Sequence, residues 1–209
     1  ISQWDYSALR VRVIMPMTNS GYGVGGESEC TESSELNPIS VYGKSKCAAE
    51  RTVLKHNGVS LRFATLFGMS PRPRIDLLVN DFVYRAMRDK YVVLFEANFR
   101  RNYLHVRDAA SAIIWAINHH DDMKGRPYNV GLPDANLTKR QLCEKIKEHV
   151  PDFYFVEAEI GEDPDRRDYV IDNSRILATG WRPQYSLDDG IRELIKGYEI
   201  LKTPRWANA

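Results

Sequence analysis

Short runs of apolar and β-branched residues alternate along the chain with longer segments whose apolar residues recur at helical spacing. Residues 10–17 (RVRVIMPM) predict a buried strand that ends near Thr18. A loop rich in Gly, Ser and Glu follows, and it runs from Asn19 to about Leu36. Residues 59–68 (VSLRFATLFG) predict a second strand, because they are rich in β-formers and end in glycine.

A helix is predicted between these two strands, over residues 40–56. Pro38 is expected in its first turn, where the missing N–H of proline costs nothing. Asn57 and Gly58 then stop the helix, since both residues tolerate the backbone conformation that follows a helix C-terminus.

The same alternation continues to the end of the chain. Thr138 is expected to cap the helix that follows it, Asp108 to help start another, and Asp188 and Asp189 to occupy the first turn of the last one. Strands alternating with helices predict an α/β fold with a mainly parallel sheet, followed by a smaller mixed region. The further strands are expected at 91–95, 126–132, 153–160 and 168–172, and the further helices at 75–90, 139–150, 173–180 and 187–201; residues 100–120 predict the end of a strand followed by a helix.

Composition narrows the classes of function. The chain has 209 residues, enough for one large domain or a domain and a half, and its formal net charge of +1 argues against a nucleic-acid-binding surface. No apolar run is long enough to cross a bilayer, so a cytoplasmic protein without membrane contact is expected. Cys30, Cys47 and Cys143 are widely spaced and match no metal-ligand pattern, so we expect reduced thiols and no metal site.

Candidate chemistry centres on Tyr42 and Lys46, which are four residues apart and therefore share one helix face. A phenol has a reference pKa of about 10, and a nearby ammonium group lowers it by stabilising the phenolate. The hydroxyl of Thr18, at the end of the preceding strand, could bind the same substrate oxygen. Such a set can move a proton to or from a carbinol while a hydride leaves or arrives. Taken alone, the spacing is also that of two ordinary surface residues.

Several motifs in a fixed order make the first interpretation more specific. They are TNSGYG, NPISVYGKSKCAAE, LRFATLFG, RRNYLHVRDAA, PYNVGLPDANLT and GWRPQYSLDDGIREL. From about Val11 to Tyr198 the chain resembles the extended short-chain dehydrogenases/reductases that act on nucleotide sugars, the NAD-dependent epimerase/dehydratase group. By that resemblance Tyr42 is the acid/base, Lys46 activates it and holds the nicotinamide ribose, and Thr18 is the family's Ser/Thr.

The resemblance also implies residues that contact ligands. Phe63 is expected beside the nicotinamide and Thr65 beside the sugar, whereas His105 is expected to be structural. Arg101 matches an arginine that binds the substrate diphosphate in relatives, which suits the bidentate geometry of guanidinium. The second diphosphate arginine of the family falls near Glu162 here, which leaves Arg167 and its neighbour Arg166 as candidates.

Two departures from the family pattern shape the expected activity. Dehydratases place an Asp-Glu pair after the catalytic Thr, but this sequence has Asn19 and Ser20 there, which we expect to face the substrate. An epimerase or an oxidoreductase acting through a keto-sugar is therefore expected, with NAD or NADP as cofactor. The family's G-x-x-G-x-x-G phosphate fingerprint is missing, and GYGVGG at 21–26 follows the wrong strand to serve as one.

The missing fingerprint predicts a partial Rossmann-like fold, a doubly wound parallel sheet that lacks its first strands. Residues 1–68 are then the remnant of the dinucleotide-binding domain, and residues 69–209 form mainly the substrate-binding region, with some elements returning to the sheet. Cofactor binding by this chain alone is doubtful on this basis. The alternative is a non-catalytic nucleotide-sugar-binding or interaction module. In relatives the helices matching 40–56 and 75–90 commonly build a dimer, so a homodimer is expected.

Overall fold

The computed structural model describes residues 11–24, 29–158 and 167–200. Its first sheet has three parallel strands in the order β1-β2-β6: β1 (Ile14–Thr18), β2 (Val59–Phe63) and β6 (Pro127–Val130). Phe63 lies opposite both Thr18 and Val130, so these strands end side by side. Loop ends and polar groups at the carboxyl edge of a parallel sheet commonly form a ligand site.

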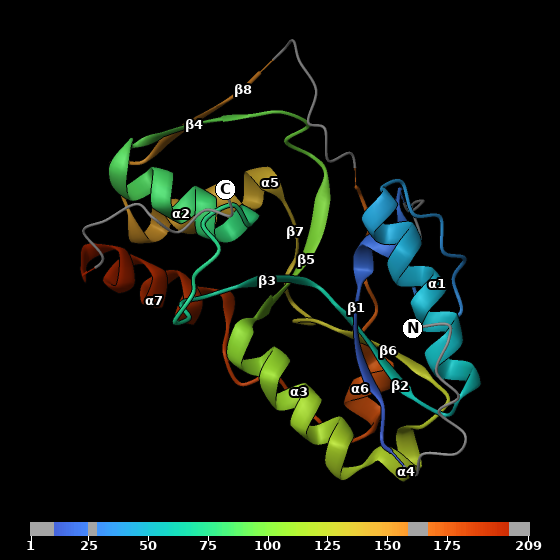
Figure 1. Ribbon diagram of the computed structural model, residues 1–209. Coiled ribbons are helices and arrows are strands. Elements are labelled where there is room, and N and C mark those ends of the chain that lie inside the picture. The colour runs from blue at the N-terminus through green and yellow to red at the C-terminus, as the bar shows by residue number, and fades with distance from the viewer. Residues whose placement is uncertain (1–10, 25–28, 159–166, 201–209) are drawn as a thin grey trace.

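Both faces of this sheet are covered by helices (Figure 1). On β1, Met15 and Met17 pack with Cys47 and Val53 of helix α1 (Val41–Lys55). On β2 the alternate side chains, such as Leu61, join a cluster formed by α3 (Val106–Asn118), α6 (Ser174–Ala178) and the short α4 (His120–Met123). Parallel sheets are normally buried on both faces, and all five residues of β2 are buried here.

The second part of the fold is mixed. Strand β5 (Arg100–His105) pairs in parallel with β3 (Thr65–Phe67) and antiparallel with β7 (Asn136–Thr138), while β4 (Tyr91–Leu94) pairs in parallel with β8 (Tyr154–Glu157). Three helices surround the largest apolar cluster: α2 (Leu78–Arg88), α5 (Lys139–His149) and α7 (Leu187–Ile200). Among the described residues, no helix is long and apolar enough to span a bilayer.

Local signals for helices are largely confirmed. Thr138 caps α5 in a capping box, in which its hydroxyl accepts a hydrogen bond from Gln141 N and the Gln141 side chain binds Thr138 N. Asp188 and Asp189 occupy the first turn of α7 as predicted. The loop after β1 begins with a short 3-10 helix, η1 (Asn19–Tyr22).

Two local predictions are wrong. Pro38 lies before α1, because Ser40 is the N-cap and its Oγ accepts a 3.0 Å hydrogen bond from Gly43 N. Asp108 lies in the first turn of α3 as predicted, although the N-cap is His105 and the Asp108 carboxylate accepts hydrogen bonds from the backbone N–H groups of Gln184 and Tyr185. The α2 helix also begins at Leu78, later than residue 75.

Two predicted strands differ as well. Residues 59–68 are not one strand, because Ala64 N bonds Val130 O and the chain then leaves β6 to pair with β5 as β3. Residues 168–172 form isolated bridges rather than a strand, at Asp168 with Val24 and at Ile171 with Cys30. In both cases the strand pairing depends on segments that are distant in sequence, so it cannot be predicted from local composition.

His105 lies in the interior, fully buried between β3 and α7, and its Nδ1 accepts a hydrogen bond from Arg107 N. Gly68, with φ of +107°, allows this close approach, because an added Cβ would lie 2.4 Å from His105 Nε2. Nε2 is 3.4 Å from a carboxylate oxygen of Glu193. Burial lowers the pKa of His105 below its ordinary value of 6.5 and outweighs the opposing effect of Glu193.

This lowered pKa predicts a loss of stability in acid. As the pH falls below 6.5, His105 becomes protonated in the unfolded chain but stays neutral in the folded chain. The free energy of unfolding therefore decreases between pH 6.5 and the lowered pKa of the folded state. Each unit of lowering corresponds to about 1.4 kcal/mol. His105→Asn keeps a capping side chain and removes the titration, so urea unfolding curves between about pH 7 and pH 5 should show a flatter pH dependence. Equal slopes for both proteins would contradict the prediction.

Candidate active site

A pocket of about 910 Å³ opens where β1 and β2 end. Its walls come from segments far apart in the chain, which the sheet pairing brings together. The residues that line it are Pro16, Met17, Thr18, Ser20, Ile39, Ser40, Tyr42, Lys46, Phe63, Ala64, Thr65, Leu66, Arg74, Leu77, Arg167 and Tyr169. Seven of the residues predicted from the sequence are in this set: Thr18, Ser20, Tyr42, Lys46, Phe63, Thr65 and Arg167.

Tyr42 and Lys46 lie one turn apart near the start of α1 and face the pocket together. The Lys46 Nζ atom is 5.8 Å from the centre of the Tyr42 ring. The same Nζ donates a 2.8 Å hydrogen bond to Pro16 O, which ties the helix to β1. Tyr42 is 55% exposed, so its hydroxyl group is accessible to a ligand.

Thr18 closes β1 and caps η1. Its Oγ1 accepts a hydrogen bond from Ser20 N at 3.1 Å and donates to Ser20 Oγ at 3.0 Å. The guanidinium of Arg167 donates to the same Ser20 oxygen. A chain of contacts therefore runs from Thr18 through Ser20 to Arg167, and all three residues line the pocket.

Two predicted residues lie behind the pocket wall. Asn19 is 1% exposed, and within the described residues neither end of its amide has a hydrogen-bond partner. Arg101 is buried as well: its guanidinium carbon lies 5.7 Å from the ring centre of Tyr169, and one N–H donates to Arg100 O. The pocket surface beside Arg101 is thus formed by Tyr169. Glu162 and Arg166 lie outside the described residues.

Sequence analysis missed several lining residues. Arg74 ends the proline-rich segment after β3, which carries no periodic pattern, and Leu77 lies near the start of the helix predicted at 75–90, where nothing marks it as a pocket residue. Ser40 could have been found from its preference for the N-cap position, and Tyr169 belongs to the family-like stretch around 168–172. These residues reach the site through tertiary contacts alone.

The pocket is positively charged. Lys46, Arg74 and Arg167 line it, and none of its lining residues within the described chain is a carboxylate. Arg74 binds Asp76 with two hydrogen bonds of 2.7 and 2.6 Å, and these bonds lower the pKa of the Asp76 carboxyl. Guanidinium and ammonium groups suit phosphate or carboxylate ligands. In the described part of the chain, no three His, Cys, Asp or Glu side chains gather as a metal site.

Comparison with known proteins gives consistent results. Residues 5–131 match the model of the NAD dependent epimerase/dehydratase family. The chain is 26% identical to the low-salt glycan biosynthesis protein Agl12 of Haloferax volcanii, over 90% of this chain and 61% of that protein. It is 24% identical to a putative UDP-glucose 4-epimerase of Methanocaldococcus jannaschii, over 85% of this chain and 60% of that protein.

Solved structures share the fold. The structure of dTDP-glucose 4,6-dehydratase from Bacillus anthracis in complex with NAD superposes with a TM-score of 0.75 at 25% identity, and it covers 94% of this chain and 63% of that one. The sheet with helices on both faces is therefore the Rossmann-like α/β arrangement that the sequence predicted. The chain spans about three-fifths of the length of the curated relatives that it matches.

Proposed function

The chain belongs to the NAD dependent epimerase/dehydratase family, and from this premise we propose that it carries the proton-transfer and substrate-binding residues of an NAD- or NADP-dependent enzyme acting on a nucleotide sugar. The observation that carries the proposal is the convergence of Thr18, Tyr42 and Lys46 on one pocket, although β1 and α1 supply them separately. The three cationic lining residues suit the phosphates of such a substrate.

Each residue has a role that its position supports. The hydroxyl group of the exposed Tyr42 would take the proton from the sugar hydroxyl, and the ammonium group of Lys46, 5.8 Å from the centre of the ring, would offset negative charge on the Tyr42 oxygen. Thr18 can turn its hydroxyl proton from Ser20 to the same substrate oxygen and hold it in place. The bound cofactor would supply the chemistry of hydride acceptance and return.

The residues present fit the nicotinamide end of the cofactor. Lys46 is anchored beside β1 with its donor groups at the pocket, and Phe63 and Thr65 close the pocket at the ends of the strands. In this proposal residues 1–68 belong to the cofactor side and residues 69–209 mainly to the substrate side. For the adenine and pyrophosphate end of the cofactor, the sequence contains no matching glycine fingerprint.

The proposed reaction is epimerisation or simple oxidation and reduction through a keto-sugar. Loss of water from the sugar needs an acid and a base, and by the family resemblance dehydratases supply them from an Asp-Glu pair directly after the catalytic threonine. Asn19 and Ser20 occupy those places, and neither side chain is a carboxylate. Asn19 is also buried behind the wall, and Ser20 is engaged with Thr18 and Arg167.

The test is to incubate the purified chain with NAD or NADP and, separately, with UDP-, GDP-, CDP- and dTDP-sugars. We expect NMR spectra of the sugar to show an epimer or a keto-sugar with at least one of them, without a dehydrated product. Calorimetry on the same samples reports binding of each ligand independently of turnover. Binding of a nucleotide sugar without cofactor binding or turnover would instead establish the non-catalytic module.

A further inference from the structure

A buried arginine joins α1, which carries Tyr42 and Lys46, to the short helix η1, which Thr18 caps. Arg62 is the fourth of the five residues of β2, on the face covered by α1, with its side chain 5% exposed. Its Nε and one terminal nitrogen donate to the two carboxylate oxygens of Glu50 in α1, at 2.9 and 2.8 Å. Its other terminal nitrogen donates to the hydroxyl of Tyr22 in η1 at 2.8 Å. One planar group therefore bonds both elements in a fixed geometry.

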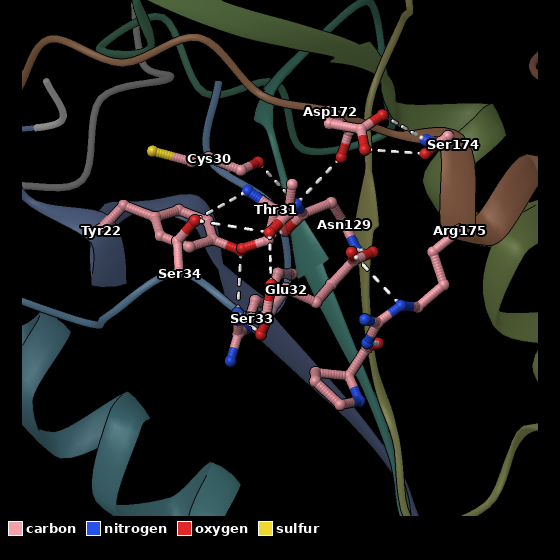
Figure 2. A network of polar contacts seen from close by, with 12 residues as sticks. Tyr22, Cys30, Thr31, Glu32, Ser33, Ser34, Asn129, Asp172, Ser174 and Arg175 are labelled. Atoms are coloured by element: carbon pink, nitrogen blue, oxygen red, sulfur yellow. Dashed lines mark hydrogen bonds and ion pairs between the residues drawn. The ribbon is translucent and has the colours of Figure 1, made fainter. Parts of the chain in front are cut away.

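Tyr22, which links Arg62 to η1, makes further hydrogen bonds. Tyr22 lies beside Thr31 and Asn129 (Figure 2), and its hydroxyl is 2.7 Å from Asn129 Oδ1 and 3.0 Å from Thr31 O. Burial raises the pKa of Tyr22 to about 12, so the phenol keeps its proton and can donate it to these acceptors. Tyr22 is thus a fixed point at the end of η1, and Thr18 lies at the start of the same short helix.

Glu50 links Arg62 to α1, the helix that also carries the candidate catalytic residues Tyr42 and Lys46. Glu50, Lys46 and Tyr42 follow one another at intervals of four residues and so lie along one side of α1. The hydroxyl of Ser60 donates to Glu50 at 2.6 Å, which fixes the carboxylate further. Because a helix is stiff over two turns, holding Glu50 sets where Lys46 and Tyr42 project.

Stability alone does not account for this pair. Removing two charges from water is costly, and well-packed apolar residues of the same volume often give equal or greater stability. A bidentate pair does, however, fix the orientation of the groups that it joins. The pair lies between η1, which Thr18 caps, and α1, which carries Tyr42. A fixed orientation of Arg62 therefore fixes these two elements relative to each other.

We propose that Arg62 is a positioning residue, which sets the Thr18 hydroxyl relative to Tyr42 and Lys46 by holding Tyr22 with one arm and Glu50 with the other. Its catalytic consequence rests on the proposed function. Misplacing reacting groups by about 1 Å can cost about a hundredfold in rate, so small shifts of η1 against α1 are measurable.

The test uses Tyr22→Phe and Glu50→Gln, which cut one arm each and change little volume. Tyr198→Phe is the matched control, because its hydroxyl also donates one partly buried hydrogen bond, of 3.1 Å to Asn80 O, and this bond joins α7 to α2 outside the Arg62 network. In Tyr22→Phe we expect kcat to fall about tenfold with KM within about twofold, whereas Tyr198→Phe leaves both values unchanged.

Amide hydrogen exchange on the ligand-free chain gives a readout that needs no turnover. In Glu50→Gln the amides of Ser20 and Gly23 should exchange about fivefold faster, the factor expected for one net hydrogen bond, although Glu50 touches neither residue. If Glu50→Gln does not fold, the amides of Lys46 and Cys47 in Tyr22→Phe serve the same purpose.

Unchanged exchange in the distant element overturns the proposal, and so does an unchanged kcat for Tyr22→Phe in an active preparation. Faster exchange across Arg62 together with the loss of kcat supports it. If the wild-type chain turns over no nucleotide sugar, the proposed function fails, and the exchange measurement still decides whether Arg62 couples η1 to α1.

Discussion

Replacing Tyr42 with phenylalanine is expected to lower turnover of a nucleotide sugar by a factor of about 10² to 10⁴, the usual contribution of a positioned acid/base group. The variant keeps the ring beside Lys46 and loses only the hydroxyl that exchanges the proton. Since Tyr42 is more than half exposed, the melting temperature should not change. Initial rates with saturating cofactor and sugar measure the effect, and calorimetry should show that ligand binding is retained.

Tyr154→Phe is the matched control for this experiment. Tyr154 is 57% exposed, similar to Tyr42, but it lies in β8 and stacks on Tyr91 away from the pocket. Because the Tyr154 hydroxyl lies outside the pocket, Tyr154→Phe should turn over the nucleotide sugar at the wild-type rate. Wild-type rates in Tyr42→Phe would remove Tyr42 from the proposed mechanism, while equal losses in both variants would point to a general effect of losing a phenol.

Replacing Glu50 with alanine is expected to cost about 3–5 kcal/mol in free energy of unfolding, the range for removing one partner of a buried ion pair. Glu50 is 3% exposed in its side chain and holds both the Arg62 guanidinium and the Ser60 hydroxyl. Burial alone would lower the pKa of Arg62, but its hydrogen bond to Glu50 helps to raise it, so the charge persists. Without Glu50 that charge stays buried and loses its carboxylate partner.

Urea denaturation followed by circular dichroism measures this cost. Glu148→Ala provides the contrast, because Glu148 pairs with Lys145 at 3.1 Å at the surface, with side chains 59% and 41% exposed. That change should cost less than about 1 kcal/mol. Similar losses for the two variants would show that the Glu50–Arg62 pair contributes no more than an exposed one.

Sequence analysis succeeded where the signal is local. The Thr138 capping box and the acidic first turn of α7 depend on residues within one helical turn, so the printed sequence contains the whole interaction. The Tyr42–Lys46 spacing is equally local, and the structure places both side chains on one pocket. The role of that pair stays a prediction until turnover is measured.

Strand pairings and site contacts between residues far apart in the chain were not predicted from the sequence. Nothing between residues 59 and 68 indicates that pairing changes at Ala64, because the change depends on Val130 and on β5. The contact of Arg167 with Ser20 joins residues 147 positions apart, and no local pattern contains it. Only the resemblance to relatives suggested Arg167, whereas Arg74 and the Glu50–Arg62 pair had no signal in the sequence.

The pairing of β2 with both β1 and β6 also has a consequence for the order of folding during synthesis. β1, α1 and β2 are consecutive and can assemble early, but β6 ends at Val130 and the pocket residues Arg167 and Tyr169 follow still later. Contacts between residues far apart in sequence form slowly, because the chain loses the entropy of closing the loop before the contact stabilises it. The ribosome therefore has to release nearly the whole described chain before the pocket can form, and nascent chains carry β2 with one unpaired edge until β6 has emerged.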